Sequence, residues 1–224
     1  KKEKMMAILN PLAIFDLDNT LIAGDSELIW VGLLASRGLV DTAYIEEISH
    51  CFLEYEAGSI NYIEYDRILL RPLIGFPKNQ LNDLVKIFLG QIQPLFRLEI
   101  IRQLEHHREL GDTILLVTAS ISLLAVPIAQ MLGITNLICT QIEINDGLPT
   151  GNLVGKPVFH EEKVRSVTSW IENNPVTLEG SWAWGDSNND IPILRLVDNP
   201  VAVYPDDLLR KHAMKNNWQI IENS

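Results

Sequence analysis

The stretch AIFDLDNTL, residues 13–21, decides the fold of this chain. Its apolar start, together with Leu12, predicts a buried strand, and two aspartates, Asp16 and Asp18, follow at the carboxyl end. Because side chains alternate along a strand, residues two apart point the same way, and both carboxylates can face one site. Open α/β sheets bind ligands at this end of their strands. Taken alone, such a pair of aspartates more often belongs to a turn with solvated side chains. The rest of the sequence has to decide between this interpretation and a functional site.

A second acidic group later in the chain favours a metal site. Gly185 lets the backbone turn sharply after an apolar strand, Asp186 stands at the tip of this strand, and Asp190 lies four residues further on. With Asp16 and Asp18, these residues place up to four carboxylates around one point. Carboxylates so close repel each other unless a cation or a proton lies between them, and Mg²⁺ is the natural hard cation for oxygen ligands. We therefore expect Mg²⁺ as the cofactor.

A third strand end offers hydrogen-bond donors. Thr118 and Ser120 follow the apolar run at 113–117 and precede a predicted helix. Hydroxyl groups and backbone N–H groups at the start of a helix form a ready anion site. A divalent cation beside an anion site suits an anionic small substrate, even in an acidic protein.

Strand and helix patterns alternate through most of the chain. Such alternation predicts an α/β fold with a Rossmann-like parallel sheet and helices on both faces. The predicted strands span residues 12–15, 113–117, 136–139, 181–184, 201–203 and 218–221, and the helices span residues 97–110, 123–132, 160–171, 190–196 and 206–215. Alternating apolar residues around Asn-Asp-Gly predict a β-hairpin at 141–153.

Residues 25–93 differ from the rest because they show only helical periodicity. In an α/β chain, such a block is an inserted helical subdomain rather than part of the sheet. We therefore expect an α/β core domain formed by residues 1–24 and 94–224, and an all-helical cap formed by residues 25–93.

The composition argues against some partners. The formal net charge is −11, whereas nucleic acid and anionic membranes require a basic face, so we expect neither as a partner. No apolar run approaches the roughly 18 residues of a membrane span. Residues 1–9 faintly resemble a signal peptide but lack a small-residue cleavage site, so we expect none. Cys51 and Cys139 show neither metal-ligand spacing nor a disulfide pattern, so we expect a cytoplasmic location.

The order of these motifs resembles the haloacid dehalogenase-like (HAD) phosphatase superfamily. The matching features are Asp16-Leu17-Asp18-Asn19-Thr20, Thr118 after the second strand, a lysine, and Gly185-Asp186-Ser187-Asn188-Asn189-Asp190. The position of the helical insertion is similar to that in the phosphoserine-phosphatase-like branch. The resemblance implies an Mg²⁺-dependent phosphatase that acts on a small phosphorylated metabolite.

The resemblance also implies a two-step reaction through an aspartyl-phosphate. Asp16 is the implied nucleophile, and Asp18 is the group that protonates the leaving oxygen and then activates water. Asp16, the backbone carbonyl of Asp18, and Asp186 are the implied Mg²⁺ ligands, with Asp190 in support. Thr118 and the lysine are implied to bind the phosphoryl oxygens.

The remaining site residues follow from the same resemblance. The lysine is expected to be Lys163, at the start of a predicted helix, and Lys156 is the alternative. The other candidates for contacts with phosphate or substrate in the core are Thr20, Ala119, Ser120 and Asn189.

The insertion offers its own candidates for substrate recognition. Arg71, with Arg67 as the alternative, is the candidate for binding a substrate carboxylate. Asp25 or Glu27 matches an acidic residue that reads a substrate amine in phosphoserine phosphatases, and both also suit a helix start.

Three other functions remain open at this point. A receiver domain of a signalling protein also places carboxylates, a Thr or Ser and a Lys around Mg²⁺, but it has neither the Asp-x-Asp pair nor a long helical insertion. The same fold could serve as a non-catalytic binding protein, or transfer phosphate to an alcohol instead of water. The sequence names neither the substrate nor the oligomeric state.

Overall fold

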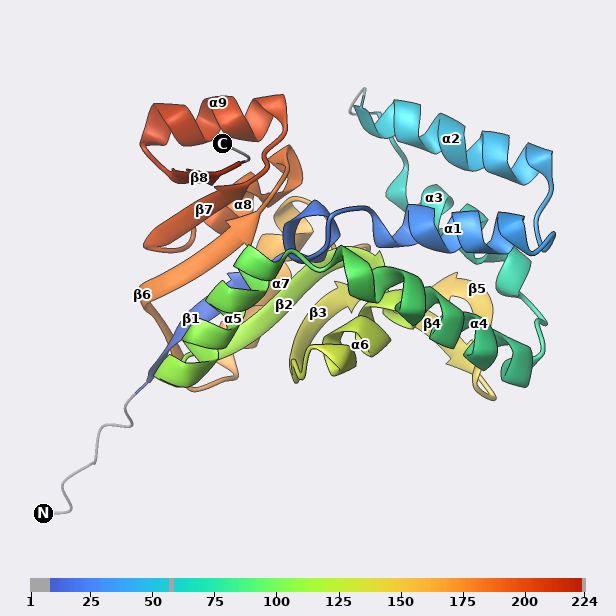
Figure 1. The fold of residues 1–224 in the computed structure, drawn as a ribbon, viewed down its shortest axis with the longest axis horizontal. Coiled ribbons are helices and arrows are strands. Elements are labelled where there is room, and N and C mark those ends of the chain that lie inside the picture. The colour runs from blue at the N-terminus through green and yellow to red at the C-terminus, as the bar shows by residue number, and fades with distance from the viewer. Residues whose placement is uncertain (1–8, 57–58, 223–224) are drawn as a thin grey trace, which may run out of the picture.

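The computed structural model describes residues 9–56 and 59–222 (Figure 1). Within these residues, six strands form one sheet in the order β3-β2-β1-β6-β7-β8, and every neighbouring pair is parallel. The strands are β1 Asn10–Phe15, β2 Thr113–Ile121, β3 Asn136–Thr140, β6 Val176–Gly185, β7 Asn199–Val203 and β8 Gln219–Ile221. The predicted parallel α/β fold is confirmed. Because β1 lies between β2 and β6, the three predicted motifs meet at one edge of the sheet.

Helices cover both faces of the sheet, since alternate residues of each strand point to opposite sides. Phe15 of β1 is buried in a hydrophobic cluster with Leu104, whereas its neighbour Ile14 is buried in a second cluster with Val167. Leu104 and Val167 belong to helices on opposite faces. The helices of this part of the chain are α5 Leu98–Leu110, α6 Ser122–Met131, α7 Glu161–Glu172, α8 Ile191–Leu194 and α9 Asp207–Asn216.

Residues 25–93, as far as the structure describes them, form only helices and turns. They are α1 Ser26–Ser36, α2 Thr42–Glu56, α3 Tyr62–Leu70 and α4 Lys78–Ile92, with short 3₁₀ turns at η2 Arg71–Leu73 and η3 Gln93–Leu95. Trp30 of α1 and Phe88 of α4 are fully buried and meet edge to face, with ring centroids 5.7 Å apart. These helices lie together beyond the carboxyl edge of the sheet (Figure 1).

The predicted hairpin is present as β4 Ile142–Asn145 and β5 Leu148–Leu153, which pair antiparallel. It packs against the helical insertion, because Ile74 approaches Gly151 so closely that a Cβ there would lie 2.6 Å from the Ile74 side chain. A segment expected to belong to the core domain thus contacts the insertion. The division of the chain into two domains remains a prediction.

Strand β2 is longer than the sequence predicts. It was expected to end at 117, but it continues to Ile121, and α6 begins only at Ser122. Ile121 pairs with Thr140 of β3 after a register shift, and the Thr140 hydroxyl donates to the Ala119 carbonyl at 2.5 Å. Side-chain bonds therefore keep the polar end of the strand extended.

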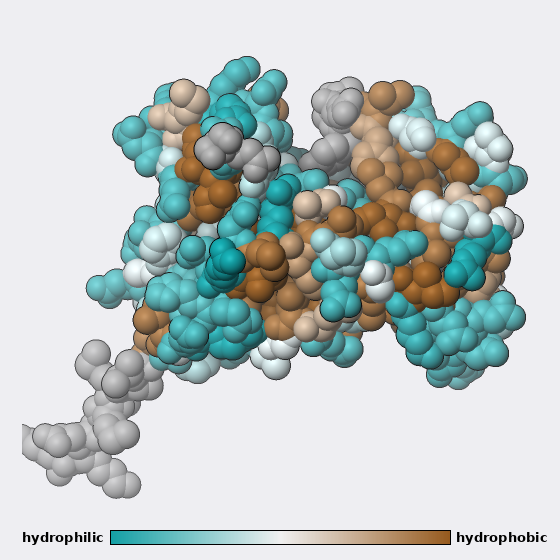
Figure 2. Space-filling view, in the orientation of Figure 1, coloured by the Kyte–Doolittle hydropathy of each residue, from teal (hydrophilic) through white to brown (hydrophobic). Residues whose placement is uncertain are grey.

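The surface shows where apolar residues remain exposed. On the face drawn in Figure 2, hydrophobic side chains gather over α1 and α2, and hydrophilic side chains cover most of α5. No helix in the described ranges has the length and apolar character needed to cross a membrane. The stretch compared above with a signal peptide lies, except for its last residue, outside the described residues.

Candidate active site

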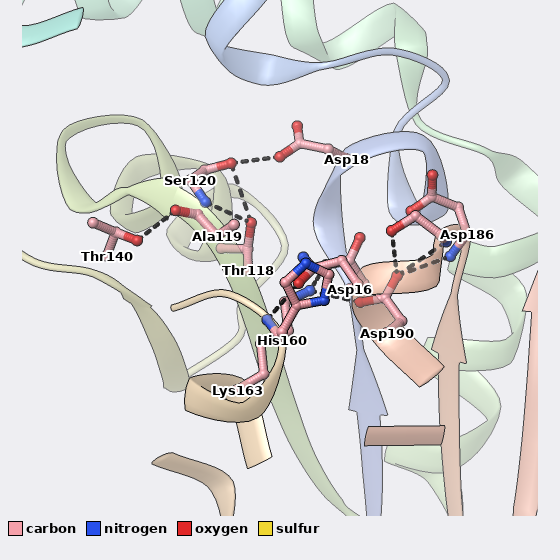
Figure 3. Close-up of polar contacts among 12 residues, drawn as sticks. Asp16, Asp18, Thr118, Ala119, Ser120, Thr140, His160, Lys163, Asp186 and Asp190 are labelled. Atoms are coloured by element: carbon pink, nitrogen blue, oxygen red, sulfur yellow. Dashed lines mark hydrogen bonds and ion pairs between the residues drawn. The ribbon is translucent and has the colours of Figure 1, made fainter. Parts of the chain in front are cut away.

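Asp16 stands at the carboxyl end of β1, at the centre of the sheet edge. Its backbone N–H donates to the Trp184 carbonyl at 3.0 Å, which continues the pairing of β1 with β6. The chain then turns tightly at Leu17–Leu21, and Asn19 adopts a left-handed conformation, φ +55°, within this turn. The Asp16 side chain is buried and accepts a hydrogen bond from Lys163 Nζ at 2.7 Å. The strand end thus holds one carboxylate in a fixed position (Figure 3).

Lys163, in the first turn of α7, joins two of the predicted acidic residues. Its ammonium group lies 2.7 Å from Asp16 Oδ1 and 2.6 Å from Asp190 Oδ1, and the residue is only 1% exposed. Burial alone would lower the pKa of Lys163, but the two carboxylates together raise it above its ordinary value. Lys156 is exposed, so the structure brings Lys163 to the site and not the alternative.

Asp186 and Asp190 complete an acidic cluster. In the described part of the chain, one carboxylate oxygen each from Asp16, Asp186 and Asp190 lies within 4.8 Å of the others. Asp190 Oδ2 also accepts from the backbone N–H groups of Asp186 and Ser187, both at 3.2 Å. Gly185 is required here, because a Cβ would lie 2.5 Å from Asp190 Cβ.

One ammonium group, that of Lys163, stands against the three carboxylates of this cluster. Burial, and then the charge of Asp190, raise the pKa of Asp16 from 3.8 to about 8 in spite of Lys163. Burial and the same neighbour raise the pKa of Asp186 well above its ordinary value. A divalent cation would replace bound protons here and relieve the repulsion, so the three carboxylates fit Mg²⁺.

Asp18 is held differently from the prediction. Its carboxylate lies outside the acidic cluster and accepts from the Ser26 backbone N–H at 2.6 Å and from the Ser120 hydroxyl. The structure does not place the Asp18 side chain among the other expected metal ligands, because its bond with Ser120 directs it toward β2 (Figure 3). The expected ligand role of its backbone carbonyl remains a prediction. The same bonds leave Asp18 lining the same cavity as Asp16.

A hydroxyl network supports Asp18. The Thr118 hydroxyl lies 3.1 Å from the Ser120 hydroxyl and accepts from the Ser120 backbone N–H, also at 3.1 Å. The Ser26 hydroxyl lies 3.0 Å from that of Ser120. All three residues are at most 2% exposed. Since α6 begins only at Ser122, the two residues of the predicted anion site, Thr118 and Ser120, lie at a strand end and not in the first turn of a helix.

These groups line one large cavity of about 1070 Å³ between the sheet edge and the insertion. Asp16, Thr118 and Lys163 lie on its core side, and Ala119, Ser120, Asp186 and Asn189 also line it. Asn189 is 5% exposed, and its side-chain oxygen accepts from the His160 backbone N–H at 2.5 Å. Asp190 lies behind this lining, where it supports Asp186 and Lys163.

Both acidic candidates of the insertion also line the cavity. Asp25 Oδ1 caps α1 by accepting from the backbone N–H groups of Glu27 and Leu28, each at 2.9 Å. Burial, and then Asp18, raise the pKa of Asp25 to about 7. The Glu27 carboxylate accepts from the Tyr65 hydroxyl at 2.8 Å and from the Ile121 backbone N–H at 3.0 Å. Asp25 therefore caps the N-terminus of α1 and lines the cavity at the same time.

Two predicted substrate-binding residues do not reach the cavity. Thr20 is fully buried, and within the described residues its hydroxyl has no hydrogen-bond partner. Arg71 lies on the outer surface, where it pairs with Glu47 and lies over the Tyr44 ring. The structure therefore does not bring either residue to the other site groups, because motif spacing does not show to which side these two side chains point. The alternative, Arg67, pairs with a neighbouring residue on the surface of α3.

Sequence reasoning missed several residues of the cavity wall. Tyr62, Phe159 and His160 are among them, and the sequence treated them only as parts of helical patterns or ignored them. Tyr62 comes from the insertion and the other two directly precede α7, so no local pattern could have linked them.

Comparison with known proteins places this site in a family. The model of the haloacid dehalogenase-like hydrolases matches residues 13–195, which include every motif described above. The chain belongs to this family. As a HAD hydrolase it is an enzyme, and the resemblance drawn from the motifs is confirmed.

Several relatives of this HAD hydrolase carry phosphatase names. A histidinol-phosphatase of Neisseria meningitidis serogroup C is 35% identical and is covered over 97% of its length by 94% of this chain. The phosphoserine phosphatase SerB1 of Mycobacterium tuberculosis is 30% identical over 95% of this chain and 70% of its own length. These names agree with a phosphoric monoester hydrolase.

Solved structures agree on the fold. A protein of unknown function from Bordetella pertussis Tohama I has a TM-score of 0.87 and 32% identity over 96% of this chain and 99% of its own. A substrate-bound phosphoserine phosphatase has a TM-score of 0.71 over 96% of this chain and 93% of its own. At 18% identity, the second likeness shows the fold alone.

Proposed function

We propose that this HAD hydrolase is an Mg²⁺-dependent phosphatase that cleaves a small phosphorylated metabolite through an aspartyl-phosphate intermediate. One observation carries the proposal: Asp16 bonds to Lys163 and lies in a carboxylate cluster at the floor of a cavity. Asp16, Asp186 and the backbone carbonyl of Asp18 would hold Mg²⁺, supported by Asp190. The bound ion would neutralise phosphoryl charge and let an anionic nucleophile approach.

Side chains of this protein then carry out the separate steps of the reaction. A carboxylate oxygen of Asp16 attacks phosphorus while the bond from phosphorus to the leaving oxygen breaks. Asp18 gives its proton to that oxygen, and it then takes a proton from the water that hydrolyses the aspartyl-phosphate and releases inorganic phosphate. Lys163 orients Asp16, and the Thr118 hydroxyl binds a phosphoryl oxygen. Ser120, bonded to Asp18, keeps the acid on the leaving-group side of the cavity.

We also propose that residues 25–93 act as a cap. Leu28, Phe52 and Tyr65 of the insertion line the cavity opposite the floor, so the insertion stands over the reacting groups. A cap in this place would exclude bulk water during transfer and admit the alcohol of the substrate. A cytoplasmic location remains a prediction from cysteine usage, and the oligomeric state stays open.

The test is phosphate release from a panel of phosphorylated metabolites, with Mg²⁺ or with a chelator. The panel includes phosphoserine and histidinol phosphate, because relatives carry the names of both activities. We expect Mg²⁺-dependent release from one or a few esters, and none by the Asp16→Asn variant. Release that persists in Asp16→Asn would refute the mechanism. A lasting phosphoprotein without turnover would support the signalling alternative instead.

A further inference from the structure

One wall of the cavity is built from aromatic side chains of two distant segments. The Tyr62 ring, at the start of α3, stacks on the Phe159 ring with centroids 3.7 Å apart and an interplanar angle of 23°. The Tyr62 hydroxyl lies 3.1 Å from His160 Nε2. All three residues are partly exposed and line the cavity. The cavity lining therefore includes a pair of stacked rings with two polar atoms beside it.

This wall is fixed to the floor through the backbone. His160 has φ +43° and ψ −116°, a conformation that residues other than glycine rarely adopt. Its N–H donates to the Asn189 side chain at 2.5 Å, and Lys163 follows three residues later on α7. The rings thus keep a set position relative to the phosphoryl-binding end of the cavity.

The size and charge of the cavity limit what can occupy it. Its volume of about 1070 Å³ is at the upper end of the range of ligand sites, and a short aliphatic ester would leave most of it empty. Phe52 and Tyr65 add aromatic surface from the insertion. Asp25 and Glu27 add carboxylates, so the same space favours a ligand with a positive group.

We infer that Tyr62, Phe159 and His160 determine specificity by selecting phosphomonoesters whose alcohol carries a flat heteroaromatic ring over short aliphatic esters. The inference rests on the proposed function, and it names the substrate class of that site. The ring would stack on the wall, a ring nitrogen would bond with Tyr62 or His160, and an amine would face the carboxylates. A short aliphatic ester can reach the floor but gains nothing from the wall.

The experiment compares two esters from the panel above, histidinol phosphate and phosphoserine. Histidinol phosphate is the ester that carries an imidazole ring. The measured quantity is the ratio of their kcat/KM values in wild type and in Tyr62→Leu. We expect wild type to favour the imidazole-bearing ester, and Tyr62→Leu to lower the ratio about 3- to 10-fold, mainly through KM, as suits the loss of one aromatic contact. Because both esters are measured on one preparation, a loss of folded protein cancels in the ratio.

Tyr44→Phe is the matched control for Tyr62→Phe. Both remove a hydroxyl from a tyrosine of the insertion, but Tyr44 bonds to the Leu69 carbonyl and does not line the cavity. We expect a lower ratio in Tyr62→Phe and an unchanged one in Tyr44→Phe. A ratio unchanged in both Tyr62 variants, or a wild type that prefers phosphoserine, would overturn the inference.

Binding separates this inference from the proposed function. Calorimetry on Asp16→Asn measures the affinity for the imidazole-bearing ester without turnover. Weaker binding by the double variant Asp16→Asn/Tyr62→Leu than by Asp16→Asn supports the role of the aromatic wall. This holds even if wild type hydrolyses neither ester, an outcome that would count only against the proposed function. Equal affinity of the two variants would overturn the inference that the wall selects the substrate, whatever the rate of turnover.

Discussion

Lys163 is a buried cation whose charge is matched by two buried carboxylates. Its ammonium group bonds to Asp16 and Asp190, which come from opposite ends of the chain. Taking such groups out of water is costly, and their attraction offsets the cost only while the set stays complete. The residue therefore has two effects that can be separated: it orients the proposed nucleophile, and it keeps the carboxylates from repelling each other.

Replacing Lys163 with Met tests this residue. The variant leaves Asp16 and Asp190 without their buried counter-charge, so we expect a loss of about 3–5 kcal/mol in the free energy of unfolding at pH 8, measured by urea denaturation. Lys156→Met is the control, because Lys156 is exposed and its replacement should change stability by no more than about 0.5 kcal/mol. Equal effects of the two substitutions would contradict the assignment of Lys163.

Ser120 gives a second prediction at the scale of one residue. Its hydroxyl donates to the Asp18 carboxylate and contacts the hydroxyl groups of Thr118 and Ser26. Ser120→Ala should lower kcat about tenfold by loosening the proposed general acid, with little change in KM. Ser36→Ala removes a hydroxyl bonded to a carbonyl on α1 outside the cavity, and kcat should not change. A higher KM with normal kcat in Ser120→Ala would instead indicate a substrate-binding role.

At the scale of elements, periodicity predicted the helices and strands because burial dominates both patterns. The sequence also predicted that Asp16, Thr118 and Asp186 meet at one sheet edge, since parallel strands place their carboxyl ends together. It could not predict the extension of β2, which depends on a bond between Thr140 and Ala119. The sequence also could not predict the direction in which side chains within turns point.

Contacts between distant elements explain why some side chains lie elsewhere than the sequence predicts. Arg71 points outward because Glu47 and Tyr44 of α2 hold it there. Tyr62 joins the wall because α3 meets the start of α7. Neither contact can be predicted from the spacing of residues along the sequence.

Helix α3 carries a prediction for stability. Asp66 is fully buried, and neither of its carboxylate oxygens has a hydrogen-bond partner within the described residues. Burial raises its pKa from 3.8 to about 8. Between these values the unfolded chain has released the proton that the folded protein keeps, so stability falls as pH rises from about 4 to 8. The slope is at most about 1.4 kcal/mol per pH unit for one group.

Asp66→Asn should remove this part of the pH dependence. Measured by urea denaturation, the variant should gain about 2–4 kcal/mol relative to wild type between pH 5 and pH 8. Asp83→Asn is the control, because Asp83 is exposed on α4 and pairs with Lys86 at the surface. If Asp66→Asn showed the same stability difference from wild type at both pH values, Asp66 would not be a buried acid.

The whole molecule combines an acidic floor with a cavity that the insertion lines from the other side. Burial and mutual repulsion raise the pKa values of Asp16 and Asp186, so a divalent cation that binds there would compete with protons. Binding to the folded state alone raises stability with ligand concentration. The proposed metal binding would therefore be linked to pH through this one site.

Thermal unfolding with Mg²⁺ or with a chelator tests this link. Mg²⁺ at about 100 times its Kd should stabilise the protein by about 2.7 kcal/mol, and the rise in Tm should be larger at pH 8 than at pH 6, where protons compete. Asp186→Asn should lose most of the rise, whereas Asp83→Asn should keep it. A rise of equal size in Asp186→Asn would place the ion elsewhere.

The proposed mechanism requires Asp16 to carry the phosphoryl group during turnover. It is tested most directly by acid quenching within the first turnover, followed by digestion and mass spectrometry of the peptides. We expect a phosphorylated peptide that contains Asp16, formed with Mg²⁺, absent with chelator and absent in Asp16→Asn. Rapid phosphate release without that peptide, or with the phosphoryl group on another residue, would contradict it.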